Sequence, residues 1–137
     1  MSVPVPKGEA TPSILIVDGD IISRHAIADY LRHCGYAVVE AATTDEAMKA
    51  LGEPSLGVDV ILCDASATGS QSAFGLSTWV RNNRPELEVR LAGSLEGILN
   101  TAADLCEHGP HLLRPYEPQA IVDYIKQLRA SRDRASR

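Results

Sequence analysis

Two short apolar runs, each followed by an aspartate, constrain the fold of this chain more than any other feature of its sequence. Ile14–Val17 (ILIV) precedes Asp18, and Val58–Cys63 (VDVILC) precedes Asp64. Nearly continuous apolar runs of this length are typical of strands covered on both faces, as in a parallel sheet. The chain therefore needs helices on both sides of a sheet, and the segments between its strands must supply them.

Helical periodicity recurs between the predicted strands. Apolar residues from Ile22 to Cys34 follow three- and four-residue steps, Thr43 and Glu46 have capping-box spacing, and Pro118 suits the first position of a final helix. Five strand–helix units in alternation predict a doubly wound α/β fold with a five-stranded parallel sheet. The remaining strands are expected at 37–40, 89–92 and 111–113, and two further helices at 76–81 and 95–107.

The length of 137 residues and a hydrophobic share of 45% predict one globular domain, which we place at residues 13–130. Residues 1–12 contain three prolines and are expected to form a flexible leader. The net charge of −5 argues against a nucleic-acid partner, although Lys126–Arg137 holds five basic residues and one acid. We interpret 131–137 as a short basic tail.

The three cysteines, Cys34, Cys63 and Cys106, are widely spaced and form no CxxC pair. This pattern favours reduced thiols in a cytoplasmic protein. No apolar run approaches the ~20 residues of a membrane span, so we expect no membrane association. Cys106, His108 and His111 offer a soft-metal alternative, but the turn at Gly109–Pro110 and the lack of a fourth ligand disfavour it.

Acidic residues follow the two most apolar strands. The carboxyl ends of parallel strands gather functional groups, so Asp18, with Asp20 nearby, and Asp64 are expected to share one small pocket. Carboxylates in this arrangement suit Mg2+, and a carboxylate can also accept a phosphoryl group. The alternative is that these acids only cap loops or helices. A flavin carrier of similar topology is disfavoured because no phosphate-binding loop follows the first strand.

The segments ILIVDGD, VDVILCD and HLLRPY, in this order and spacing, resemble the receiver domain of two-component response regulators. The resemblance covers residues 13–129. It implies a sheet of order 2-1-3-4-5 and phosphoryl transfer to Asp64 from a histidine kinase or a histidine phosphotransfer protein. It also implies Mg2+ at Asp18 and Asp64, with Asp20 as a further candidate ligand, and no enzymatic activity of the domain itself.

Several family positions are altered. The second acid after the first strand is Gly19, so we expect weak Mg2+ binding, and Asp20 suits an N-cap better than a ligand. Arg114 stands in the lysine position before Pro, where it keeps the charge but changes its geometry. The switch hydroxyl falls on Ala92 or Gly93, which leaves Ser94 as the nearest candidate.

The family's switch aromatic in the fifth strand is replaced by His111, which we retain as a candidate switch residue. Our interpretation is a stand-alone receiver in a phosphorelay that accepts phosphate on Asp64 and signals through protein contacts. The resemblance places those contacts on the fourth helix, fifth strand and fifth helix, and a homodimer is compatible with it. The alternative is a pseudo-receiver that binds a partner without phosphorylation.

Overall fold

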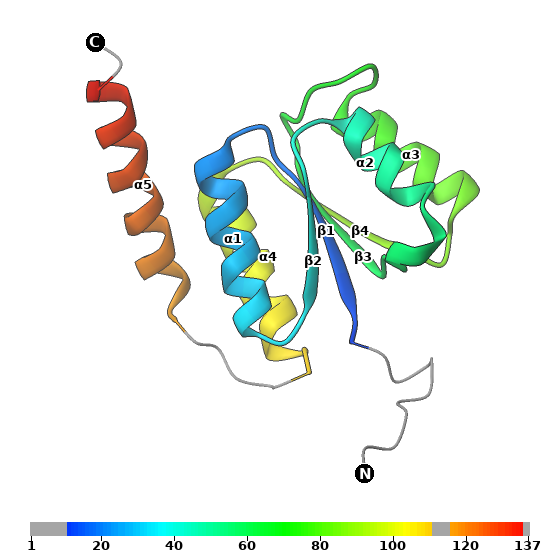
Figure 1. Cartoon of the computed structure of the whole chain (residues 1–137), viewed down its shortest axis with the longest axis horizontal. Coiled ribbons are helices and arrows are strands. Elements are labelled where there is room, and N and C mark those ends of the chain that lie inside the picture. The colour runs from blue at the N-terminus through cyan, green and yellow to red at the C-terminus, as the bar shows by residue number, and fades with distance from the viewer. Residues whose placement is uncertain (1–10, 111–115, 136–137) are drawn as a thin grey trace.

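The computed structural model describes residues 11–110 and 116–135. Within these residues the strands form one parallel sheet with the order β2-β1-β3-β4 (Figure 1). The apolar run 14–17 lies in a central strand, as its composition predicts, because both of its faces are covered. The strands are β1 (Ser13–Val17), β2 (Ala37–Ala41), β3 (Val60–Asp64) and β4 (Glu88–Ala92).

Helices cover both faces of the sheet (Figure 1). One face carries α1 (Ile21–His33), α4 (Leu95–Glu107) and α5 (Pro118–Ala135), and the other carries α2 (Thr44–Leu51) and α3 (Ala73–Asn83). A short 3-10 turn, η2 (Pro54–Leu56), follows α2. The arrangement confirms the predicted α/β layers.

The core divides at the sheet. In β1, Ile14 and Ile16 point into the cluster beneath α1, α4 and α5, whereas Leu15 and Val17 point into the cluster beneath α2 and α3. All four side chains are at most 1% exposed. Because successive residues of a strand face opposite sides, an apolar run of four residues supplies both halves of the core.

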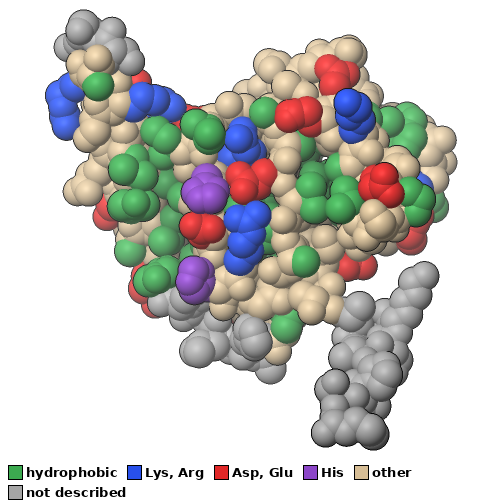
Figure 2. All heavy atoms as spheres, in the orientation of Figure 1, with side chains coloured by type: hydrophobic (Ala, Val, Ile, Leu, Met, Phe, Trp, Pro, Cys, Tyr) green, Lys and Arg blue, Asp and Glu red, His purple; other side chains and the backbone are tan. Residues whose placement is uncertain are grey.

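Ion pairs fix α1 against the edge strand β2. The Glu40 carboxylate lies 3.3 Å from Arg24 Nε through one oxygen and 3.3 Å from Arg32 Nη2 through the other. Figure 2 shows basic and acidic side chains next to one another over these two elements, beside a group of hydrophobic side chains over α1 and α5. Solvent screening limits the stability that each of these partly exposed pairs contributes.

The described strands confirm the predicted order 2-1-3-4, while the predicted fifth strand at 111–113 lies outside the described residues. The helix expected at 76–81 is longer and begins at Ala73, because the Ser72 hydroxyl caps it by accepting a hydrogen bond from Gly75 N–H. Residues 131–135 continue α5 as helix. No helix in the described part of the chain is long and apolar enough to cross a membrane.

The cysteine prediction is wrong for two of the three residues. Cys34, at the C-terminal cap of α1, and Cys106, in the last turn of α4, form a disulfide with their Cα atoms 5.3 Å apart. The two helices lie on the same face of the sheet, so residues 72 positions apart in sequence meet. Cys63 is a buried free thiol. The expected cytoplasmic location, which relied partly on reduced thiols, stays a prediction.

Candidate functional site

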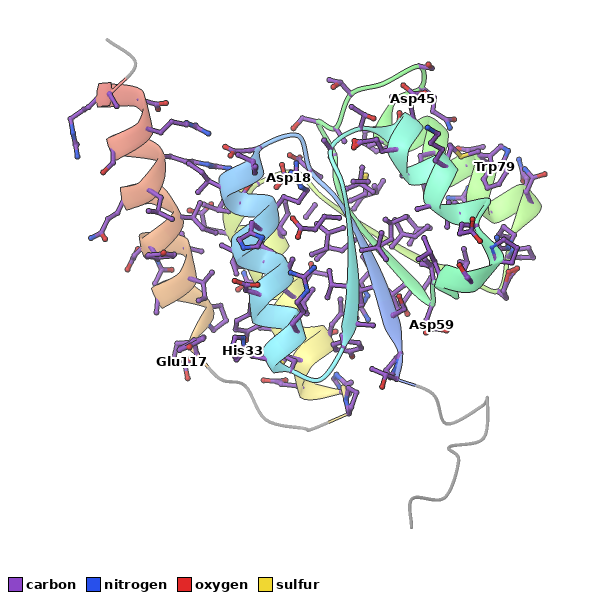
Figure 3. All side chains as sticks on the ribbon, viewed as in Figure 1. Asp18, His33, Asp45, Asp59, Trp79 and Glu117 are labelled. Carbon is purple, nitrogen blue, oxygen red and sulfur yellow. A yellow bond between two sulfur atoms is a disulfide. The ribbon has the colours of Figure 1, made fainter. Side chains whose placement is uncertain are left out.

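The carboxyl edge of the sheet brings together the two predicted strand-end aspartates. The register pairs Val17 of β1 with Cys63 of β3, so Asp18 and Asp64 follow neighbouring, aligned residues. Figure 3 shows Asp18 at this edge and Asp59 at the opposite end of the sheet. The strand-end rule therefore predicts correctly which acids of this chain lie together.

Asp18 is held rigidly at the base of the site. Its side chain is buried, with Oδ1 accepting a hydrogen bond from Asp20 N–H at 2.9 Å and Oδ2 accepting one from the Ser23 hydroxyl at 2.6 Å. Burial raises the pKa of Asp18, the two hydrogen bonds lower it in part, and the neighbouring Asp64 charge raises it further. Burial is the largest cause, so the net result is a raised pKa for Asp18.

Asp64 is the last residue of β3, and one of its two carboxylate oxygens accepts hydrogen bonds. Its Oδ1 accepts hydrogen bonds from the backbone N–H of Ser66 at 3.0 Å and from the Ser66 hydroxyl at 2.8 Å. No described residue donates a hydrogen bond to its Oδ2. The preceding Cys63 is inert, because burial and the nearby carboxylates raise its thiol pKa to about 12. Asp64 is therefore the reactive candidate of this strand end.

A pocket of about 240 Å³ connects these acids to α4 and α5. Ser94 lies on its wall, where its Oγ also caps α4 by accepting a hydrogen bond from Gly97 N–H at 3.0 Å. A ligand that takes this hydroxyl must therefore compete with the helix cap. The lining residues are Asp18, Asp64, Ser66, Gly93, Ser94, Leu95, Ile98 and Arg129.

Asp20 has a structural role that the sequence predicts in part. Its carboxylate caps α1 by accepting a hydrogen bond from Ile22 N–H at 2.9 Å. The same carboxylate also lies 2.8 Å from Arg129 Nε and 3.1 Å from Arg132 Nη1, both on α5. Burial raises the pKa of Asp20, but the Ile22 hydrogen bond and the two arginines outweigh it and hold the pKa below its usual value.

The donor set does not fit a tightly held divalent cation. Asp18 and Asp64 supply two carboxylates, Asp20 is engaged by two guanidinium groups, and no group of three metal-ligating side chains exists among the described residues. The guanidinium of Arg129 also lines the pocket and repels a metal ion. Mg2+ takes a near-octahedral set of oxygen ligands, and beyond these two carboxylates the described side chains leave the remaining positions to water.

At two of the altered family positions, Gly19 and Gly93, the structure has room for a side chain. A Cβ at Gly19 would make only an ordinary contact, 3.6 Å from the Ala42 carbonyl oxygen, and a Cβ at Gly93 would meet no atom within 4 Å. The missing acid and hydroxyl are therefore sequence changes that the backbone does not impose. Arg114, which stands in the family's lysine position, and His111, the candidate switch residue, lie outside the described residues.

Sequence reasoning missed Arg129. The cluster of basic residues from Lys126 onward is visible in the sequence, but the packing of α5 decides which of these side chains face the pocket. In the structure α5 crosses beside α1, and Arg129 Nη2 donates a hydrogen bond to the Ser23 hydroxyl at 3.0 Å. No local motif signals this contact, because it joins residues more than a hundred positions apart.

Sheet order, helix placement and the acidic carboxyl edge together define a doubly wound α/β domain with a site at the strand ends. Among solved structures, this fold is that of the response regulator receiver domain. No protein-family profile and no curated protein matches the sequence.

Three similar structures illustrate the match. The receiver domain of the stress response regulator RcsB from Escherichia coli is 22% identical, with 69% of this chain and 76% of that chain covered and a TM-score of 0.54. A receiver domain protein from Clostridium thermocellum is 20% identical, with 87% and 98% covered and a TM-score of 0.55. The chemotaxis response regulator CheY4 of Vibrio cholerae is 20% identical, with 86% and 98% covered and a TM-score of 0.54.

Proposed function

We propose that this chain is a phosphoacceptor receiver that takes a phosphoryl group on Asp64 and passes the signal on through protein contacts. The observation that carries the proposal is the position of Asp64, which lines a pocket together with Asp18 at the carboxyl edge of the sheet. The receiver fold of the similar structures supports this assignment. The resemblance of the sequence motifs to receiver domains implies the same acceptor, Asp64.

In the proposed transfer, each bond that forms is matched by one that breaks. An oxygen of the Asp64 carboxylate forms a bond to phosphorus as the P–N bond of a phosphohistidine breaks. The electron pair of the broken bond stays with the imidazole nitrogen, which takes up a proton from water. Asp64 Oδ1 is held by Ser66, so the carboxylate is fixed in orientation and Oδ2 is the attacking oxygen.

The partners follow from the same reaction. The phosphoryl donor is a histidine kinase or a histidine phosphotransfer protein, and the recipient of the signal is a further protein. The surface of α4 and α5 is suited to the second contact, because both helices border the pocket through Ser94 and Arg129. A phosphoryl group at Asp64 would therefore change the charge and the contacts at these two helices first.

Phosphorylation by a small donor tests the proposal. Incubation with acetyl phosphate should add one phosphoryl group, detected by intact mass, and Asp64→Asn should abolish the addition. The matched control is Asp59→Asn, at the opposite end of β3, where the carboxylate accepts a hydrogen bond from Ser13 N–H. This variant should accept phosphate like the wild type. A wild type that takes no phosphate, with or without Mg2+, would leave the pseudo-receiver, which binds its partner unmodified.

A further inference from the structure

Among the described residues that line the pocket, Arg129 carries a positive charge and the other charged side chains are acids. It extends from α5 and shares the pocket with Asp18 and Asp64. About one third of its side chain is exposed (32%), and its Nε atom is buried. The guanidinium is therefore partly removed from water, where its electrostatic effect is stronger than on an open surface.

A hydrogen-bonded chain fixes this guanidinium relative to the acids. Arg129 Nη2 donates to the Ser23 hydroxyl at 3.0 Å, and that hydroxyl donates to Asp18 Oδ2 at 2.6 Å. On its other side, Arg129 Nε faces Asp20 Oδ2 at 2.8 Å in an ion pair that lacks the alignment of a hydrogen bond. Ser23 is fully buried, so these two hydrogen bonds lie in the protein interior.

Phosphorylation of Asp64 would increase the negative charge in the pocket. The aspartyl phosphate carries up to two charges where the carboxylate carried one, beside the buried Asp18. The structure offers two carboxylates for a metal, which is a weak set, but it also offers a planar guanidinium. Such a group pairs with phosphate oxygens through two parallel hydrogen bonds.

We propose that Arg129 acts as a built-in cation of this pocket, and that it supplies counter-charge for the phosphoryl group on Asp64 in place of a divalent metal. This inference rests on the proposed function for its phosphorylated state. It assigns a positioning and charge-balancing role to a residue of the last helix, and it makes phosphoryl acceptance largely independent of Mg2+.

The first experiment compares phosphorylation in a chelating buffer. The wild type should take phosphate from acetyl phosphate in the presence of chelator. Arg129→Gln should do so about tenfold more slowly or worse, because a charge-assisted contact in the transition state is lost. Arg129→Lys should retain part of the rate. The matched control is Arg132→Gln, which removes the same charge from α5 and also loosens Asp20, but does not line the pocket.

Arg132→Gln should stay close to the wild-type rate, and adding Mg2+ should rescue Arg129→Gln because the vacated pocket can now hold the metal. Thermal melting of each variant shows that it is folded. The proposal is overturned if the wild type needs Mg2+ for any incorporation, or if Arg129→Gln reacts as fast as the wild type in chelator.

A calorimetric titration with MgCl2 separates this proposal from the proposed function. Arg129→Gln should bind Mg2+ about tenfold more tightly than the wild type, because a like charge has left the pocket. This result is expected even if neither protein accepts phosphate, in which case only the phosphoacceptor function fails. Equal Mg2+ affinities of the wild type and Arg129→Gln would show that the guanidinium does not take the place of a metal ion in the pocket.

Discussion

Reduction of the Cys34–Cys106 disulfide should cost this domain a large part of its stability. The two cysteines are 72 residues apart, so the bond closes a long loop in the unfolded chain. In the chain-entropy account, a cross-link over a loop of this length stabilises the folded state by about 4 kcal/mol. Both cysteines are fully buried, and the bond joins the C-terminal ends of α1 and α4 within the core.

Thermal and urea unfolding with and without a reductant measure this contribution. The reduced wild type should melt lower by about 10 to 20 °C, since 1 kcal/mol shifts the midpoint of a domain of this size by about 3 to 5 °C. The double variant Cys34→Ala, Cys106→Ala should melt near the reduced wild type and should not respond to reductant. The reasoning is refuted if alkylation finds all three thiols free in the native protein, or if reductant shifts the double variant as far as the wild type.

Two further outcomes follow from the acids at the sheet edge. The pKa of Asp18 is raised in the folded state, so the stability gained by its protonation is present at low pH and lost as pH rises through that pKa. Asp18→Asn should therefore raise the urea midpoint at neutral pH and have less effect near about pH 4, and a pH-independent difference would contradict this cause. Gly19→Asp should raise Mg2+ affinity roughly tenfold, the value of one added charged contact, because the backbone leaves room for the side chain. Calorimetry checks this change, and an unchanged affinity would show that a carboxylate at position 19 does not reach the pocket.

The sequence predicts the fold well because its signals are local. The run 14–17 is typical of a strand covered on both sides, and Asp20 is a good cap for the helix that follows. The structure confirms both, together with the order of the described strands and the meeting of Asp18 with Asp64. Each of these features depends on residues within a few positions of one another, or on a general rule of parallel sheets.

The features that the sequence did not reveal depend on packing between distant segments. Cys34 and Cys106 pair only because α1 and α4 lie on the same face of the sheet. Arg129 reaches Ser23 only because α5 lies against α1. Neither contact has a spacing motif, and the widely separated cysteines read alone favoured reduced thiols. Such contacts follow from the orientation of whole helices, which local periodicity does not fix.

The two ends of α1 are attached to the rest of the domain by different kinds of bond. At its C-terminal end, Cys34 forms a covalent link to α4. At its N-terminal end, Asp20 is held by Arg129 and Arg132 through ion pairs, which salt screens and a competing phosphoryl group can displace. The covalent attachment of α1 therefore lies at the end of the helix away from the pocket, and its attachment by charge lies beside the pocket. A change of charge in the pocket would therefore act on the ion pairs of Asp20 and leave the disulfide at the other end of α1 untouched.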